Sequence, residues 1–131
     1  MDFETYMRFV DGVTSDTSKN LDDLIEHLIK LRDSGEKPSR FMTAGIGLAS
    51  ESGEIAEIVK KVIFQGKPLN DDTKFHVKRE LGDVMWYVAQ MCIALEIDFD
   101  GIIDENFHKL ESRYPGGFSV ENSENRVKGD L

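Results

Sequence analysis

The chain has 131 residues, of which 40% are hydrophobic, so it is long enough for one domain with a single core and is not typical of a wholly disordered protein. Its 25 acidic and 16 basic residues give a formal net charge of -9 at pH 7. A net-acidic surface repels phosphate backbones, which argues against binding to long nucleic acid or to an anionic membrane. It does not exclude a nucleotide, because a metal ion or a few local cations can reverse the field inside one pocket. We interpret residues 1–131 as one domain, with 119–131 as a polar tail.

The first residues and the longest apolar runs predict where the protein resides. Residues 1–4 lack the basic segment and apolar run of a signal peptide. No apolar stretch approaches the roughly 20 residues that cross a bilayer. Cys92 is the only cysteine, which excludes an internal disulfide. The sequence therefore predicts a cytoplasmic protein without a membrane partner.

The first third of the chain predicts two helices. A short one carries apolar residues on one face and ends where polar residues occupy positions 14–20. Asn20 is placed to cap the second, which ends before the Gly35 to Pro38 segment. The residues expected to be buried are Phe3, Tyr6, Met7 and Val10 in the first helix and Leu21, Leu24, Ile25, Leu28 and Leu31 in the second.

A long third helix is predicted from a cap at Ser39 to about Phe64. It contains Gly45, Gly47 and Gly53, and each glycine costs about 1 kcal/mol in a helix interior. Their presence indicates a close approach by another helix or a ligand.

Two further helices follow a loop at residues 65–70. The fourth is predicted from about Asp72 to Glu96. The fifth is capped by Asp98 or Asp100 and ends near Tyr114. No alternating run predicts a strand, so the fold class is all-α, a helical bundle. The residues expected to be buried in the fourth helix are Val77, Leu81, Val84, Val88, Met91 and Leu95.

Two of these helices carry carboxylates on their core-facing sides. At about 100° of rotation per residue, Glu51 lies in the middle of the apolar stripe of the third helix, with Glu54 about 60° to one side. On the fourth helix, Glu80 lies within about 40° of Val84, and Asp83 flanks Glu80 by about 60°. The apolar residues within about 60° of Glu51 are Ala44, Leu48, Ile55, Ile58 and Val62.

Buried carboxylates need compensation, because desolvation and like-charge repulsion both oppose their ionisation. Mg²⁺ prefers hard oxygen ligands and would suit carboxylates on two facing helices. The alternative is that the acids lie at solvated edges of the bundle or pair with nearby cations. The candidate cations are Lys60, Lys61, Lys78 and Arg79.

The fifth helix carries an amide and two cations near its apolar stripe. Arg113 lies within about 40° of Asn106, and Lys109 lies about 60° away. Opposite a metal site, these groups are suited to holding phosphate oxygens. The alternative is that Lys109 and Arg113 only neutralise the acidic helices.

Three segments resemble the MazG-like nucleotide pyrophosphohydrolases, and together they span about residues 41 to 118. Residues 47–54, followed by Lys60-Lys61, resemble the first metal-binding helix of that family, and residues 80–87 resemble the second. They match the signature E-x-x-E … E-x-x-D, with 25 residues between Glu54 and Glu80. Residues 106–115 are similar to the Asn/Lys/Arg segment that follows in the family.

The resemblance implies an all-α protein with a four-helix catalytic core, completed by assembly into a homodimer or homotetramer. It implies hydrolysis of (d)NTPs between the α- and β-phosphates to the monophosphate and pyrophosphate, with Mg²⁺ as cofactor and Mn²⁺ as a substitute. The implied metal-binding and catalytic residues are Glu51, Glu54, Glu80 and Asp83. The implied phosphate-binding residues are Lys60, Lys61, Asn106, Lys109 and Arg113.

Two alternatives to a general nucleotide pyrophosphohydrolase remain open at this point. One is a relative with the same metal chemistry that prefers dUTP or dCTP. The other is a catalytically silent helical module whose acidic face binds Mg²⁺, Ca²⁺ or a basic partner protein.

Overall fold

A computed structural model describes residues 2–125 of the chain. In this part of the chain no strand forms, and the single β-bridge joins Pro115 and Gly117. The predicted all-α class is therefore confirmed. Across the same residues, no helix combines the length and the apolar character needed to cross a membrane. The helices are α1 (Phe3–Val13), α2 (Asp16–Lys19), α3 (Leu21–Asp33), α4 (Pro38–Gln65), α5 (Asp71–Leu95), α6 (Phe99–Arg113) and α7 (Val120–Glu124).

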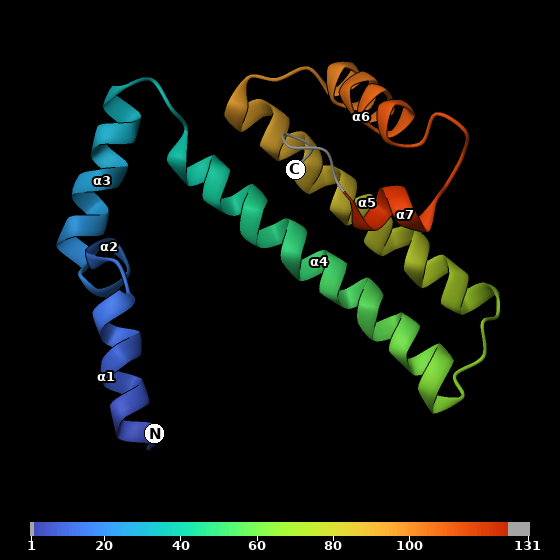
Figure 1. Ribbon diagram of the computed structural model, residues 1–131, viewed down its shortest axis with the longest axis horizontal. Helices are drawn as coiled ribbons and strands as arrows, with labels where there is room; N and C mark the ends of the chain where they lie inside the picture. The colour runs from blue at the N-terminus through green and yellow to red at the C-terminus, as the bar shows by residue number, and fades with distance from the viewer. Residues whose placement is uncertain (1, 126–131) are drawn as a thin grey trace.

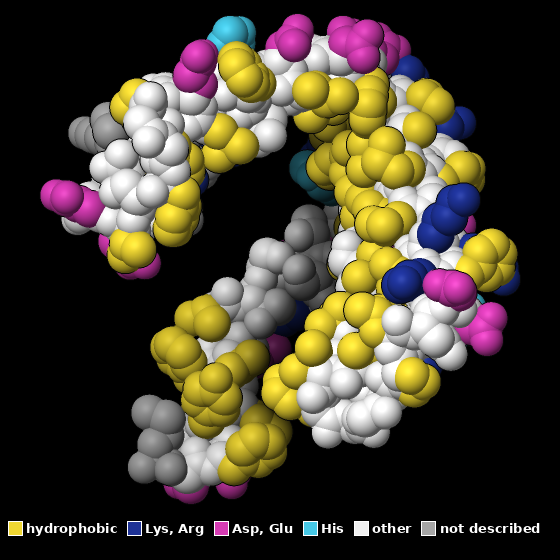
Figure 2. All heavy atoms as spheres, turned by 90° about the vertical axis from the view of Figure 1, so that its right-hand side faces the viewer, with side chains coloured by type: hydrophobic (Ala, Val, Ile, Leu, Met, Phe, Trp, Pro, Cys, Tyr) yellow, Lys and Arg dark blue, Asp and Glu magenta, His cyan; other side chains and the backbone are white. Residues whose placement is uncertain are grey.

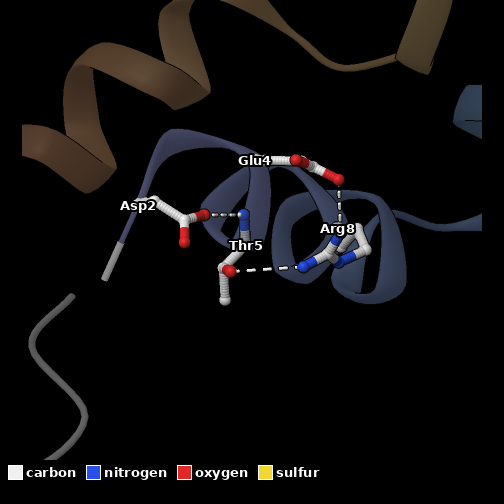
Figure 3. A network of polar contacts seen from close by, with 4 residues as sticks. All are labelled: Asp2, Glu4, Thr5 and Arg8. Carbon is white, nitrogen blue, oxygen red and sulfur yellow. Dashed lines mark hydrogen bonds and ion pairs between the residues drawn. The ribbon is translucent and has the colours of Figure 1, made fainter.

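The beginning of α1 is fixed by local polar contacts, which Figure 3 shows. The Asp2 carboxylate accepts a hydrogen bond of 2.7 Å from the Thr5 backbone N–H, which satisfies a donor that a helix N-terminus otherwise leaves free. Arg8 donates to the Glu4 carboxylate at 2.7 Å and to the Thr5 hydroxyl at 3.2 Å. This part of the molecule is organised by short-range contacts.

Two of the predicted helix caps are confirmed and one is wrong. The Asn20 side chain accepts from the Asp22 N–H at 2.9 Å, and the Asp98 side chain accepts from the Gly101 N–H at 3.0 Å. Ser39 does not cap α4, because Pro38 already occupies the first turn and Lys37 precedes it without a side-chain cap. Proline lacks an N–H and has a fixed φ, so it is favoured at that first position.

The long helices α4 and α5 form an antiparallel hairpin, which Figure 1 shows as two helices side by side. Ala44 and Ala94 are buried along it, and Gly47 meets the ring of Tyr87. A Cβ atom at position 47 would lie 2.1 Å from Tyr87 Cε1, so only glycine permits this approach. The close approach predicted from the glycines is confirmed at Gly47.

The other two glycines of α4 behave differently. A Cβ atom at Gly45 or Gly53 would meet no other atom within 4 Å in this chain. The expected approach of another helix is therefore not met at these two positions within the described residues, and the alternative of a ligand is not tested by this contact.

The turn between α4 and α5 is held by backbone geometry and a buried threonine. Gly66 adopts a left-handed conformation with φ 71°, and the next N–H, from Lys67, donates to the Lys61 carbonyl at 3.1 Å. Thr73 is buried and donates from its hydroxyl to the Pro68 carbonyl at 2.9 Å. The two ends of the turn are thus fixed relative to both helices.

Many apolar side chains that the sequence predicted to be buried are exposed in the single chain. Leu21 is 68% exposed, Leu81 51% and Phe3 74%. The prediction of burial is wrong for these residues, because no other helix of the described residues covers them. Other stripe members are half-buried, namely Leu24, Leu28, Leu31, Val77, Val84, Val88 and Met91. Figure 2 shows hydrophobic side chains gathered over a broad area of the face turned to the viewer. Other exposed members of these stripes are Tyr6, Met7, Val10, Ile25 and Leu95.

The C-terminal part adds two helices beyond the hairpin. In Figure 1, α6 follows the connection from the end of α5 and lies on the side of α5 away from α4. The Asn122 side-chain amide donates to the Arg113 carbonyl at 2.9 Å, which ties α7 to the end of α6. Part of the predicted polar tail is therefore the short helix α7, and residues 126–131 of that tail lie outside the described part of the chain.

Candidate metal centre

Three glutamates from the two hairpin helices converge on one place. Glu51 and Glu54 lie one turn apart on α4, and Glu80 lies on α5. Each offers a carboxylate oxygen, and the three oxygens lie within 4.8 Å of one another. Glu51 and Glu80 are half-buried, whereas Glu54 is exposed. The antiparallel packing of α4 on α5 therefore produces the acidic cluster that the rotation of each helix suggested.

Asp83, the fourth predicted carboxylate, lies one turn after Glu80 and is exposed. It is not part of the three-oxygen group, but its negative charge repels the carboxylate of Glu51. Burial raises the pKa of Glu51, and repulsion from Glu54, Asp83 and Glu80 raises that pKa further. Ionising all four carboxylates together is therefore unfavourable without a compensating positive charge.

The nearby lysines do not supply that charge. Across residues 2–125, none of the four carboxylates forms an ion pair with a lysine or an arginine. Lys60 and Lys61 instead both pair with Glu57, the second at 3.3 Å, and these contacts lower the pKa of Glu57. The alternative that neighbouring cations neutralise the acidic pairs is thus not what this fold shows.

The donor set fits a divalent cation with a preference for oxygen. Three carboxylates from two rigid helices provide hard, anionic ligands on one side, and the exposed side of Glu54 leaves access for water and a ligand. Mg²⁺ bound by proteins commonly uses one or two carboxylates and completes its octahedron with waters and phosphate oxygens. The residues present are consistent with that arrangement.

An open hollow of about 590 Å³ lies beside the cluster, within the range of roughly 300–1,000 Å³ that is usual for small-molecule sites. Two members of the acidic cluster, Glu54 and Glu80, form part of its wall. Of the two predicted lysines, Lys61 lines it and Lys60 does not. The remaining lining residues are Ser50, Gly53, Glu57, Ile58, Lys67 and His76.

The predicted phosphate-binding residues of α6 lie elsewhere. Asn106 and Lys109 line a different hollow on α6 that contains none of the four carboxylates. The Arg113 guanidinium lies over the Tyr114 ring, 5.9 Å from its centroid. Within the described chain, none of these three residues lines the hollow beside the acidic cluster.

Comparison with known proteins agrees with this geometry. Residues 41–118 match the MazG nucleotide pyrophosphohydrolase domain, a range that begins within α4 and ends after α6. The chain belongs to the MazG family. It is also similar to the Gene 37 protein of Mycobacterium phage L5, with 37% identity over 82 residues that cover 62% of this chain and 72% of the phage protein. No solved structure matches the chain.

Within the MazG domain, the hollow also includes a lysine and a histidine that are not among the predicted site residues. Lys67 and His76 both line it beside Glu54 and Glu80. A signal for His76 was present, since it lies four residues before Glu80 and so on the same face of α5. Helical rotation also separates the two lysines, because Lys61 lies about 20° from Glu54 whereas Lys60 lies about 120° from the same residue. Lys67 had no periodic signal, because it lies in a turn.

Proposed function

We propose that the chain hydrolyses nucleoside or deoxynucleoside triphosphates to the monophosphate and pyrophosphate in a Mg²⁺-dependent reaction. The observation that carries this proposal is the convergence of Glu51, Glu54 and Glu80 within a domain of the MazG family. These three carboxylates would hold Mg²⁺, and Mn²⁺ would substitute because it accepts the same oxygen ligands. When bound, the ion neutralises phosphate charge and lowers the pKa of a bound water.

The four carboxylates would have two different roles, which depend on their positions. Glu51, Glu54 and Glu80 form the three-oxygen group, and Asp83 stands outside it while remaining close enough to affect the pKa of Glu51. We assign to Asp83 the orientation of the attacking water and the acceptance of its proton. The water oxygen then bonds to the α-phosphorus, the bond from that phosphorus to the bridging oxygen breaks, and pyrophosphate leaves.

The phosphates would be held by cations at the edge of the acidic cluster. Of the two adjacent lysines, we assign this role to Lys61, since it lines the hollow, and the neutralisation of Glu57 to Lys60. Asn106, Lys109 and Arg113 remain candidate phosphate ligands. Because α6 of the same chain directs Asn106 and Lys109 to another hollow, we assign these three residues to the site of a second copy.

Assembly with a second copy is therefore part of the proposal, as a homodimer or a homotetramer. It is supported by the wide exposure of large apolar side chains on α1, α3, α4 and α5, which no other helix of the described chain covers. Exposed apolar area of this extent is characteristic of surfaces that bind other proteins. The substrate preference is open within the class, and selective cleavage of dUTP or dCTP is the second candidate.

The test is to measure pyrophosphate and monophosphate release from a panel of NTPs and dNTPs, with Mg²⁺ and with a chelator. The wild type is compared with Glu51→Gln, Glu80→Gln and the control Glu26→Gln, which alters an exposed carboxylate of α3 outside the MazG domain. We expect Mg²⁺-dependent release of both products by the wild type and the control. The two cluster variants should lose at least about 100-fold in kcat/KM, since each removes a charged ligand of the metal.

The same panel separates the alternatives. A dominant rate with dUTP or dCTP identifies the selective relative. Binding of Mg²⁺ without turnover of any triphosphate, at a site insensitive to added nucleotide, contradicts the enzyme proposal and favours the acidic binding module.

A further inference from the structure

We propose that Lys67, in the turn between α4 and α5, is a further substrate-binding residue that holds the pyrophosphoryl end of the triphosphate. This proposal rests on the proposed function, because it assigns a ligand to the hollow beside the acidic cluster. Its basis is the place where the turn fixes Lys67, the charges that surround it, and the continuity of the hollow with Glu54 and Glu80.

The backbone of the turn sets the position of Lys67 independently of its side chain. The left-handed Gly66 reverses the chain, and the Lys67 N–H then donates to the Lys61 carbonyl at 3.1 Å. One residue later, the Pro68 carbonyl accepts from the buried Thr73 hydroxyl at 2.9 Å. Lys67 is thus anchored to the last turn of α4 on one side and to the first turn of α5 on the other.

The environment of Lys67 differs from that of the neighbouring lysines. Lys60 and Lys61 share one carboxylate, Glu57, whereas Lys67 is half-buried and forms no ion pair with any residue between 2 and 125. A lysine held in this way at the wall of a hollow is therefore suited to an anion that enters the hollow.

The hollow joins this lysine to the acidic cluster. Glu54 and Glu80 contribute both to the three-oxygen group and to the wall of the hollow. Lys61, Lys67 and His76 also line that wall, and so does Glu57, which is paired with Lys60 and Lys61. Lys67 and His76 also line a smaller hollow over the turn, so they lie toward the closed end of the hairpin. One region of the wall therefore suits a metal-bound phosphate, and another suits an unshielded phosphate anion.

Because the carboxylates and the lysines line different regions of the hollow, a bound triphosphate has one favoured orientation. The reacting α-phosphate must lie at the carboxylates that hold the metal and orient the water. The β- and γ-phosphates carry most of the charge of a triphosphate, so they extend toward Lys61 and Lys67. Lys67 then contacts the group that leaves as pyrophosphate, and a nucleoside monophosphate does not reach it.

The experiment measures the binding of inorganic pyrophosphate to the full chain by titration calorimetry in the presence of Mg²⁺. The variants are Lys67→Gln, Lys67→Arg and the control Lys74→Gln, whose lysine is exposed, lies outside the hollow and pairs with Asp71 at 3.5 Å. A charged hydrogen bond of this kind corresponds to a change of about tenfold or more in affinity. We expect Lys67→Gln to bind pyrophosphate at least about tenfold more weakly, and both Lys67→Arg and Lys74→Gln to stay near the wild type.

Kinetics with the preferred triphosphate give a second readout. Lys67→Gln should raise KM by about tenfold, while inhibition by the product monophosphate stays unchanged. Circular dichroism should show an unchanged fold, because the turn depends on the backbone N–H of Lys67. An active Lys67→Gln variant with wild-type KM and wild-type pyrophosphate affinity overturns this proposal and leaves the proposed function intact.

The calorimetry also decides the case in which the wild type cleaves no triphosphate. Pyrophosphate binding that depends on Lys67 but not on Lys74 would then support the anion site while the proposed reaction fails. A wild type that binds no pyrophosphate in the presence of Mg²⁺ overturns the assignment of Lys67.

Discussion

The α4–α5 hairpin and the helices around it differ in how completely their side chains are packed within one chain. The hairpin packs closely enough that the Tyr87 ring fills the space over Gly47, and it brings three carboxylate oxygens within 4.8 Å of one another. By contrast, α1 and α3 present large apolar side chains to solvent, and α6 holds its polar residues away from the acidic cluster. The acidic cluster is therefore built within one chain, whereas the apolar faces of α1 and α3 are left uncovered by the described helices.

The largest effect is expected from a charge placed on an uncovered apolar face. Ile46, on α4, is 69% exposed in the single chain. If a second copy covers this face, Ile46→Glu buries an unpaired carboxylate and costs about 3–5 kcal/mol at the contact. We expect the assembly to dissociate at micromolar concentration in analytical ultracentrifugation. Gln65→Glu, at an exposed polar position of the same helix, is the control and should leave the assembly intact.

A wild type that sediments as a single copy at high concentration would contradict this prediction. So would an Ile46→Glu variant that assembles as the wild type does.

The hairpin itself is tested by a matched pair of glycine substitutions in α4. Gly47→Ala places a methyl group against the Tyr87 ring and should destabilise the fold by about 1–3 kcal/mol through overpacking. Gly45→Ala meets no atom within 4 Å in the chain and should stabilise α4 by up to about 1 kcal/mol through helix propensity. Urea unfolding measures both values. Equal effects of the two substitutions would show that the hairpin does not pack as described.

A smaller effect is expected from the charge of Glu51 in the absence of metal. Because the folded state raises the pKa of Glu51, the ionised carboxylate destabilises the fold. Its contribution is most favourable below the ordinary glutamate pKa of about 4.3 and is lost as the pH rises through the raised value. With a chelator present, Glu51→Gln should therefore have a higher Tm than the wild type at pH 7, and the difference should vanish near pH 4.

Added Mg²⁺ should reverse that order. A ligand at about 100 times its Kd stabilises the folded state by about 2.7 kcal/mol, and only the wild type keeps the full ligand set. Thermal unfolding with Mg²⁺ should place the wild type above Glu51→Gln. A Tm of the wild type that Mg²⁺ does not change would contradict the assignment of the cluster as a metal site.

The smallest effect is expected at the start of α1, outside the hairpin. The hydrogen bond from the Thr5 N–H lowers the pKa of Asp2, so this cap stabilises the helix above the ordinary aspartate pKa of about 3.9 and is lost as the pH falls through the lowered value. Asp2→Ala should lower the Tm slightly at pH 7 and leave it unchanged at very low pH. Thermal unfolding at both pH values tests this.

The sequence predicted the elements that have a long apolar stripe. The third predicted helix, Ser39 to about Phe64, corresponds to α4 at Pro38–Gln65, and the fourth to α5 at Asp71–Leu95. The helices α2 and α7 were not predicted, since a helix of one or two turns is too short to show a periodic stripe. The cap at Ser39 was wrong because Pro38 occupies the first helical position and Lys37 is the cap, two residues earlier.

The acidic site was predictable in part. Rotation about each helix placed Glu51 and Glu80 toward the core, and the antiparallel hairpin brings them together with Glu54. Helical periodicity does not describe the place of Lys67 in the wall of the hollow, because that place depends on the left-handed Gly66. Periodicity also shows which face of a helix is apolar but not which chain covers it, so the exposure of residues such as Leu81 was missed.

The central claim is attack of water on the α-phosphate at the carboxylates of the hairpin. Its most direct test is turnover of the preferred triphosphate in ¹⁸O-labelled water with Mg²⁺, followed by mass spectrometry of both products. We expect one ¹⁸O atom in the monophosphate, unlabelled pyrophosphate, and no turnover by Glu80→Gln. Label in the pyrophosphate, release of orthophosphate in place of pyrophosphate, or full activity of Glu80→Gln would contradict it.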